Sequence, residues 1–294
     1  MIKIDPKEVS LGRLQQYLTA LIAPRPIAFA STIDKEGNNN LSPFSFFNIF
    51  SNNPPMVIFS PARRVRDNTT KHSYQNVLEV PEVVINMVNY EMVQQASLAS
   101  TEYPKGVDEF LKSGFTAIDS VLVKPKRVKE SPVQLECKVK NVFELGSEGG
   151  AGILVMAEII MIHVSEGVMF GDKISQDLLR LVGRLGESWY CKAFGDSLFE
   201  IEKPLTTLGI GVDQIPISIR NSKILTGNDL GQLGNIEILP TKNDTLEFVE
   251  QNNINKLITA GSLDKVEMIH KLAKKYLEMN KVKEAWMILL SVEK

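Results

Sequence analysis

The residues from Asn38 to Pro61, NNNLSPFSFFNIFSNNPPMVIFSP, combine aromatic rings with prolines, serines and asparagines and carry no charge. Main-chain groups and the hydroxyls of Ser42 and Ser45 offer hydrogen-bond partners, and five phenylalanines offer flat apolar surface. This mixture suits a planar ligand with a polar edge and apolar faces. A buried strand interrupted by a proline bulge has the same composition, so both interpretations stay open at this point.

Basic side chains follow this uncharged run. Arg63, Arg64 and Arg66 come after the strand-like residues 56–60. A helix is predicted to begin near Thr69, because the residues just before and after it are good N-caps. The free N–H groups and the positive dipole end of a helix favour an anion. The segment therefore predicts an anion site, with a solvated loop as the alternative for any single arginine.

Alternating strand and turn signals predict a mainly β first part of the chain. Strands are expected at residues 26–33, 41–49, 56–60, 83–88, 134–145 and 153–164, and helices at 66–79, 91–101 and 108–113. The last two strands are joined by GSEGGAG, which is typical of a hairpin turn and lacks the ending of a phosphate loop. Hairpin links among at least six strands predict an antiparallel barrel, closed or partly open, with Greek-key connections and peripheral helices.

The composition changes after Lys203 and Pro204, which predicts two domains, 1–203 and 204–294. Residues 206–235 are rich in Gly, Ile and Asn and are predicted to form an irregular arm. The pattern becomes helical from Thr245 and ends in a helical hairpin with Asn280 as a C-cap. Its apolar faces are Leu263, Val266, Ile269, Leu272, Ala273, Tyr276 and Leu277, then Val282, Ala285, Trp286, Leu289 and Leu290.

The bulk properties argue against several classes of protein. A net charge of −2 and a pI of about 6.0 lack the basic excess that nucleic acid or an anionic membrane would require. Cys137 and Cys191 form neither a disulfide framework nor a metal-binding spacing, and the three histidines are scattered. No signal peptide and no apolar run of about 20 residues is present. We therefore expect a cytoplasmic protein with no metal, membrane or nucleic-acid partner.

Five motifs occur in one order along the chain: APRPIAFASTIDKEGNNNLSPFSFFN, NNPPMVIFSPARR, KHSYQN, VVINMV and LVGRLGESWYCKA. Together they closely resemble the flavin reductase-like family of FMN-binding split β-barrels, which includes flavoredoxin. The resemblance covers roughly residues 15–200 and is most specific at PRPIA followed by NLSPFSFFN. It implies a six-stranded split barrel, a homodimer, and FMN held near the subunit interface.

The resemblance also implies roles for individual residues. The family places Lys-Asp-Thr, two further residues and Asn where this chain has Lys71, His72, Ser73 and Asn76. Lys71 and Ser73 are therefore predicted to bind the FMN phosphate, together with one of the arginines, while the role of the His72 position is left open. Arg25 and His163 are expected near the flavin, with a structural role as the alternative for each. The complete predicted set is Arg25, Ser42, Pro43, Phe44, Ser45, Asn48, Ser60, Arg63, Arg64, Arg66, Lys71, Ser73 and His163.

Three functions fit these residues. The first is an FMN-dependent oxidoreductase in which NAD(P)H passes hydride to flavin N5. The second is a flavoredoxin-like FMN electron carrier without its own nicotinamide site. The third is a non-catalytic interaction module centred on the C-terminal residues. Flavin and nicotinamide nucleotides are the expected ligands, an electron-acceptor protein is a further expected partner, and no catalytic acid or base is identified.

Overall fold

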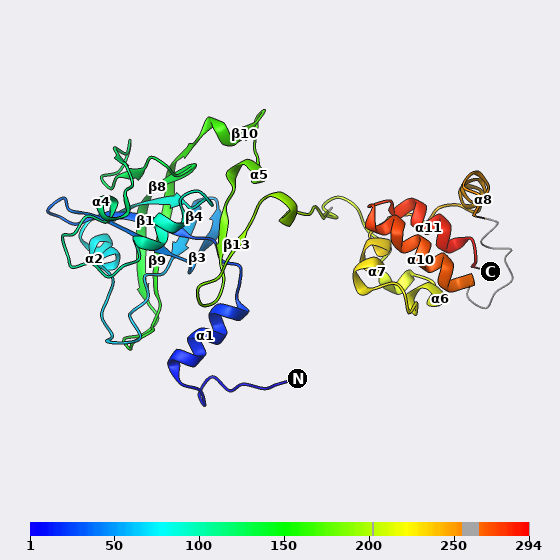
Figure 1. Ribbon diagram of the computed structural model, residues 1–294, viewed down its shortest axis with the longest axis horizontal. Coiled ribbons are helices and arrows are strands. Elements are labelled where there is room, and N and C mark those ends of the chain that lie inside the picture. The colour runs from blue at the N-terminus through cyan, green and yellow to red at the C-terminus, as the bar shows by residue number, and fades with distance from the viewer. Residues whose placement is uncertain (202, 255–264, 294) are drawn as a thin grey trace. The chain divides into compact units, whose positions relative to one another are not determined.

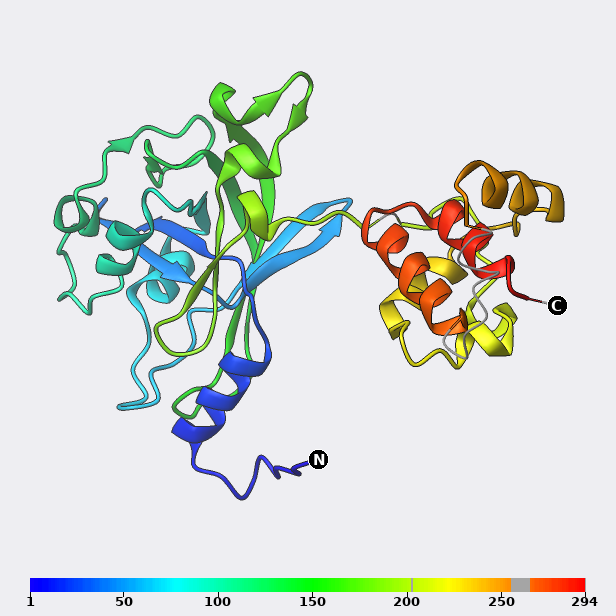
Figure 2. The same cartoon turned by 45° about the vertical axis from the view of Figure 1, so that its right-hand side comes forward.

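The computed structural model describes residues 1–201, 203–254 and 265–293. It divides the chain into two compact units, Met1–Phe199 and Glu200–Lys294. The first unit holds the strands and the second is helical (Figures 1 and 2). This division lies close to the composition change at Lys203 and Pro204. Within the described residues, no helix is both long enough and apolar enough to cross a membrane.

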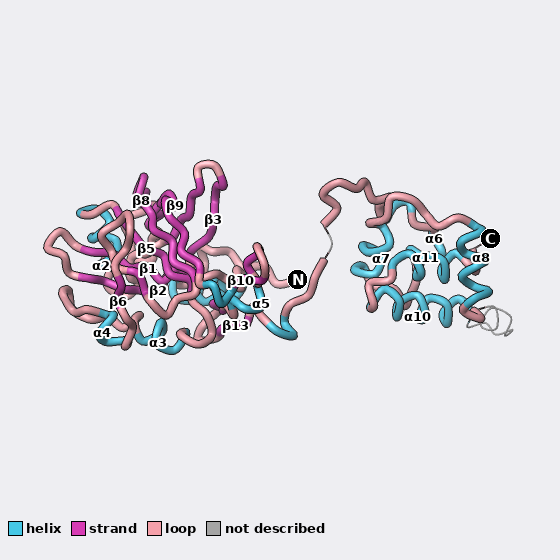
Figure 3. The backbone as a smooth tube through the Cα atoms, turned by 90° about the horizontal axis from the view of Figure 1, so that it is seen from above, coloured by secondary structure: helices cyan, strands magenta, loops and turns pink. Residues whose placement is uncertain are grey.

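A seven-stranded antiparallel sheet forms the centre of the first unit (Figure 3). Its spatial order is β2-β1-β5-β8-β9-β4-β3. The strands are β1 (Ala28–Ile33), β2 (Asn39–Phe44), β3 (Phe47–Asn52), β4 (Pro55–Phe59), β5 (Glu82–Met87), β8 (Val133–Glu144) and β9 (Ile153–Val164). The sheet therefore has one strand more than the six that were predicted.

The additional strand arises because the predicted strand 41–49 is two strands. Ser45 and Phe46 separate β2, which pairs with β1, from β3, which pairs with β4. The run contains no glycine or other clear turn signal there, so its continuous pattern concealed the corner. β2 and β3 are the two edges of the sheet. Since so short a link spans only about 10 Å, the sheet must roll until its edges approach at this corner, although no ladder closes it.

Successive side chains of β1 point to opposite faces of the sheet, and both of these faces are buried. Ala28 and Ala30 pack in a cluster with Phe44 and Phe59, whereas Phe29 packs in a second cluster with Phe110 and other residues. Helices and three small two-stranded sheets complete the unit. They are α1 (Leu11–Leu21), α2 (His72–Glu79), α3 (Val93–Leu98), α4 (Glu109–Ser113), α5 (Gln176–Leu179), β6 (Ala117–Ile118), β7 (Arg127–Val128), β10 (Met169–Phe170), β11 (Lys173–Ile174), β12 (Val182–Arg184) and β13 (Tyr190–Lys192).

Helix α2 begins later than predicted. The Asp67 carboxylate accepts hydrogen bonds from the Thr69 main chain at 3.1 Å and from its hydroxyl at 2.6 Å. These contacts form a local turn that competes with the helix. Lys71 is consequently the N-cap, without a side-chain cap bond, and His72 is the first helical residue. The expectation of a helix start near Thr69 was wrong.

The second unit has a core of its own. Helices α10 (Lys265–Glu278) and α11 (Val282–Leu290) form the predicted hairpin, and Trp286 donates a hydrogen bond from Nε1 to the Leu233 carbonyl at 3.0 Å. Leu263 lies outside the described residues. The prediction of an irregular arm was wrong in part, because Ile217–Arg220 and Gly227–Gly234 form helices and residues of the arm pack in this core. The further helices are α6 (Ile217–Arg220), α7 (Gly227–Gly234) and α8 (Lys242–Gln251).

The buried carboxylate of Glu136, on β8, holds the loop at Val121 and Leu122 in place. Glu136 accepts hydrogen bonds from the main-chain N–H groups of Val121 at 2.8 Å and Leu122 at 2.6 Å. It also lies 2.7 Å from Nε2 of His163 on β9. Burial would raise the pKa of Glu136, but these three contacts outweigh it and hold the pKa below its usual value.

We predict that Glu136→Gln lowers the Tm by roughly 3 to 10 °C at neutral pH, because two main-chain donors lose a charged acceptor. The depressed pKa means that this contribution is present above the unfolded-state pKa and is lost as the pH falls through the folded-state pKa. Calorimetry across that range should show the difference from wild type shrinking with falling pH. Glu158→Gln, which removes a partly exposed partner of Lys140, is the control. A difference that is constant with pH would contradict the prediction.

Candidate functional site

A groove of about 620 Å³ lies beside the corner between β2 and β3. Its volume is in the range of pockets that hold small ligands. Nine of the residues predicted to bind a cofactor line it, although they come from separate strands and loops. They are Arg25, Pro43, Phe44, Ser45, Ser60, Arg63, Arg64, Arg66 and Lys71.

The corner gives the groove an apolar surface. Phe44 is buried and packs against Phe59, with 5.5 Å between ring centroids. Phe46 is 45% exposed and lines the groove, and the Arg25 guanidinium lies 6.0 Å from its ring centroid. Phe44 therefore anchors the corner to the core, whereas Phe46 presents its ring to the groove. Phe46 was not among the predicted site residues.

Arg25 fixes the walls of the groove. Its buried guanidinium donates to the carbonyls of Thr19 at 2.7 Å, Leu185 at 2.9 Å and Ile22. Burial, and then the nearby charge of Arg184, lowers the pKa of Arg25. These contacts tie the end of α1 and the turn after β12 to the start of β1. Three main-chain carbonyl groups, together with Ser45 Oγ at 3.5 Å from Nε, are thus the partners of this side chain, as its structural alternative predicts.

Sequence reasoning missed several lining residues. Helix α1 was not predicted, although Ser10 Oγ caps it by accepting a hydrogen bond from the Arg13 main-chain N–H and leucines recur at helical spacing. Arg184, Leu185 and Glu187, from the motif RLGESWY, also line the groove. The missed residues are Gln15, Gln16, Thr19, Phe46, Ala62, Val65, Glu102, Arg184, Leu185 and Glu187.

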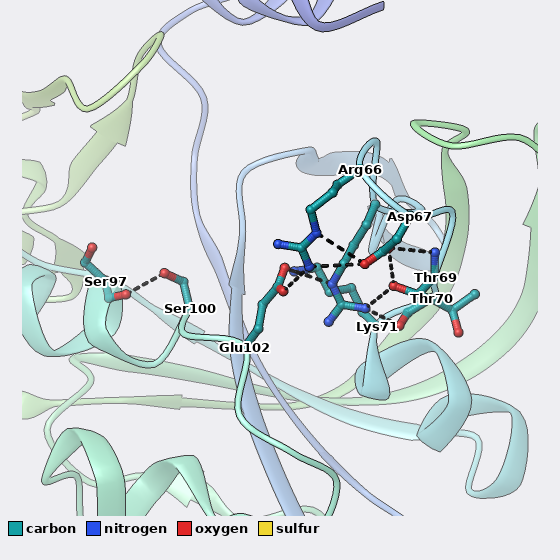
Figure 4. A network of polar contacts seen from close by, with 9 residues as sticks. Arg66, Asp67, Thr69, Thr70, Lys71, Ser97, Ser100 and Glu102 are labelled. Atoms are coloured by element: carbon teal, nitrogen blue, oxygen red, sulfur yellow. Dashed lines mark hydrogen bonds and ion pairs between the residues drawn. The ribbon is translucent and has the colours of Figure 1, made fainter.

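Three cations converge on one carboxylate at the basic end of the groove, and Figure 4 labels Arg66, Lys71 and Glu102 among these side chains. Arg64 Nε lies 2.9 Å from Glu102 Oε1, and Arg66 Nη2 lies 2.7 Å from Glu102 Oε2. Lys71 Nζ lies 3.9 Å from Oε1 of the same side chain. Burial, and then the charge of Arg64, lowers the pKa of Lys71. Such a cluster suits an anion, and it brings one loop, residues 64–71, together with Glu102 from a distant part of the sequence.

Arg63 adds a further donor. Its Nε is buried and has no hydrogen-bond partner within the described residues, while Nη2 lies 3.4 Å from Glu144 Oε2. Burying an N–H group without a partner is costly. An anionic or carbonyl-bearing ligand in the groove would offer such a partner.

The glycine-rich turn between β8 and β9 supports the arginine loop. Gly150 N–H donates to the Arg63 carbonyl at 3.1 Å. A Cβ on Gly149 would lie 3.1 Å from the main-chain oxygens of both Arg64 and Val65. The absence of side chains lets two main chains pack closely. The turn predicted as a hairpin link thus also positions the cations.

Two predicted serine contacts lie beside the groove. Ser42 and Ser73 line a small adjoining cavity together with Arg64 and Lys71. Ser73 is buried and its hydroxyl donates to Asn40 Oδ1 at 2.6 Å. This bond occupies the hydroxyl proton, so the contact of Ser73 with a phosphate stays a prediction.

Asn48 and His163 lie away from the groove. Asn48 is exposed on the edge strand β3, where its Oδ1 accepts from the Ile49 main chain at 2.8 Å. His163 lines a separate cavity of about 780 Å³ and contacts the buried Glu136. In one copy of the chain neither residue reaches the cations, and their contact with a cofactor stays a prediction.

Comparison with known proteins identifies the family of this chain. Residues 21–175, more than half of the chain, match the flavin reductase like domain. The chain belongs to the flavin reductase-like family. An uncharacterized protein of Aquifex aeolicus is 35% identical over 199 residues, which cover 66% of this chain and 97% of that protein. The predicted resemblance is therefore confirmed.

Solved structures of the flavin reductase-like fold also match. Nitrilotriacetate monooxygenase component B from Bacillus cereus gives a TM-score of 0.64 at 28% identity, covering 68% of this chain and 98% of that one. Flavoredoxin of Desulfovibrio vulgaris gives 0.52 at 21% identity, covering 66% and 96%. A further match, at 24% identity, has a split barrel domain, in agreement with the rolled, open sheet.

We predict that Gly150→Ala weakens anion binding at the arginine loop. Its φ of +85° disfavours a side chain, and the new Cβ would lie 3.3 Å from side-chain atoms of Leu11 and Val65. Calorimetry should show a Tm lower by roughly 2 to 8 °C, and titration should show weaker binding of inorganic phosphate.

Gly171→Ala provides the matched control for this prediction. Gly171 also has a positive φ, of +62°, but an added Cβ there has nothing within 4 Å. The control should lose stability through backbone strain while keeping its affinity for phosphate. Equal phosphate affinity in the Gly150 variant and wild type would refute the supporting role of the turn.

Proposed function

We propose that the first unit binds FMN in the groove and reduces it with NAD(P)H. The observation that carries this proposal is the pairing of an apolar corner with a convergent cluster of Arg64, Arg66 and Lys71 in one groove. FMN requires both features, because it joins a flat ring system with a polar edge to a phosphate dianion. Membership of the flavin reductase-like family supports the same conclusion.

The residues present fit the two ends of the cofactor. Phe46 and Pro43 offer cover for a flat ring. Strand β2 is a sheet edge and pairs only with β1, so alternate main-chain groups face away from the ladder and are free to meet a polar ring edge. At the other end, the guanidinium groups of Arg64 and Arg66 suit phosphate oxygens, and Arg63 Nε supplies a buried donor.

A bound flavin would supply the redox chemistry, accepting hydride from a nicotinamide at N5. The work of this chain is binding and orientation. Arg25 holds α1 and the turn after β12 against the corner, which fixes the walls around the ring. Arg64, Arg66 and Lys71 would hold a phosphate group at the basic end of the groove and so would orient the cofactor.

The edge strand β3 supports the proposed homodimer. Its Ile49 is 56% exposed and its Phe50 is 63% exposed. An unpaired strand edge with large apolar side chains is a favourable surface for association. A homodimer across this edge would cover these residues, and Asn48 lies on the same strand.

The decisive experiment is an anaerobic titration of the FMN-loaded protein with NADH and then NADPH, following the visible absorbance of the flavin. Rapid bleaching of FMN supplied in large excess over protein would support a reductase. Bound FMN that bleaches only with dithionite would replace this proposal with the electron-carrier alternative. If FMN does not bind at all, the proposal fails and the helical unit becomes the candidate for function.

We predict that Lys71→Gln raises the Kd for FMN roughly tenfold, because a charged contact with phosphate is worth about 1.5 kcal/mol. Riboflavin, which lacks the phosphate, should bind both proteins equally. Fluorescence titration of both ligands measures the difference. Lys140→Gln, which removes a cation paired with Glu158 outside the groove, is the control. Equal weakening of FMN and riboflavin would argue against a phosphate contact.

A further inference from the structure

We propose that Glu102 is a built-in competitor for the cofactor phosphate, and that it sets how tightly a phosphorylated flavin is held and how readily it leaves. This inference rests on the proposed function of the groove. It concerns how an acidic side chain regulates ligand binding in the groove. Glu102 was not predicted to be part of this site.

Glu102 binds the cations as a phosphate would. Its two oxygens are shared between Arg64 Nε at 2.9 Å and Arg66 Nη2 at 2.7 Å, with Lys71 Nζ at 3.9 Å (Figure 4). Carboxylate and phosphate oxygens take guanidinium N–H groups in the same way. A phosphate that uses these donors must therefore displace the Glu102 carboxylate.

Arg64 and Arg66 have further contacts that hold their guanidinium groups without Glu102. Arg64 Nη1 donates to Thr69 Oγ1 at 2.8 Å and to the Thr70 carbonyl at 2.7 Å. Arg66 Nη2 lies 3.1 Å from Asp67 Oδ2, and hydrogen bonds from Thr69 hold the pKa of Asp67 down, at about 2. The donors thus remain positioned when the Glu102 side chain swings away, and Asp67 stays with its own loop.

The surroundings of Glu102 allow its side chain to move away from the cations. Its side chain is 42% exposed, and exposed ion pairs contribute little to stability, so that a dianion can replace it at low cost. The main chain around it is held by turns, with Thr101 N–H donating to the Leu98 carbonyl at 3.1 Å and Tyr103 N–H to the Thr101 carbonyl at 2.9 Å. The side chain can therefore leave the cations while its backbone remains in place. Hydrogen bonds from Arg66 and Arg64 lower the pKa of Glu102, so it stays charged near neutral pH.

The test compares Glu102→Gln with wild type for three ligands: FMN, riboflavin and inorganic phosphate. Removal of the competing charge should tighten FMN and phosphate by roughly three- to tenfold. Riboflavin should change by less than about twofold, because it does not use the cations. Stopped-flow dilution should show slower release of FMN. Glu102→Ala, which removes both charge and hydrogen-bonding groups, should tighten FMN as well.

Glu91→Gln is the matched control. Glu91 forms an exposed ion pair with Arg180 at 2.5 Å, and neither residue lines the groove. This variant should bind all three ligands as wild type does. It therefore separates the local effect of Glu102 from the loss of one negative charge in the protein.

The outcomes separate this inference from the proposed function. Wild-type affinity for FMN and phosphate in both Glu102 variants would overturn the inference while leaving FMN binding intact. Equal tightening of riboflavin and FMN would overturn it too, because the effect would not be on the phosphate. If wild type binds neither flavin, the proposed function fails, and the phosphate titration still decides whether Glu102 competes for the cations.

Discussion

The structure of the first unit depends on one constraint, which is that only Ser45 and Phe46 join the two edge strands of its sheet. So short a link forces the edges together at one end and rolls the sheet around its core. Phe44 packs into that core at one side of the link, and Phe46 is therefore turned outward. The same corner exposes main-chain groups that the edge strands do not use in pairing. Apolar surface and hydrogen-bonding capacity thus occur together as a consequence of the topology.

The charged side chains around this corner have different roles, which depend on how deeply each is buried. Arg25 is buried, and three carbonyl oxygens satisfy its donors, so it serves as a structural clamp. Arg64, Arg66 and Lys71 converge and repel one another, which favours an anion among them. Glu102 supplies that anion from within the chain. Stability of the cluster and affinity for an external phosphate are therefore opposed, since the same donors serve both.

Local patterns were sufficient to predict most of the strands, including the long pair at residues 134–145 and 153–164, because alternation and turn composition act over short distances. They did not predict the corner, since its residues carry no turn signal. They also missed helix α7, because its glycines have low helix propensity. Thr226 and Asp229 nevertheless form a capping box at its start, and the helix packs in the core of the second unit. In each case, tertiary contacts decided the local structure.

The site was predictable to a similar extent. The arginines and Lys71 follow one strand, so their proximity could be inferred from the chain. Glu102 lies some thirty residues further on and meets them only through the fold. The role of Ser73 was harder to infer, because its competing bond to Asn40 depends on how α2 sits against β2. The motif thus identified the hydrogen-bond donors of the site, but not the residues that compete for its groups, which are Glu102 and Asn40.

The two units differ in what they contribute to this chemistry. Every residue found to line the groove belongs to the first unit. The second unit closes a core around the fully buried Trp286 and places His270 beside Ser222, where burial lowers the pKa of the imidazole. Its buried residues form a core of their own. The proposed flavin chemistry is therefore argued from residues of the first unit alone, and a measurement of flavin binding tests the role of that unit.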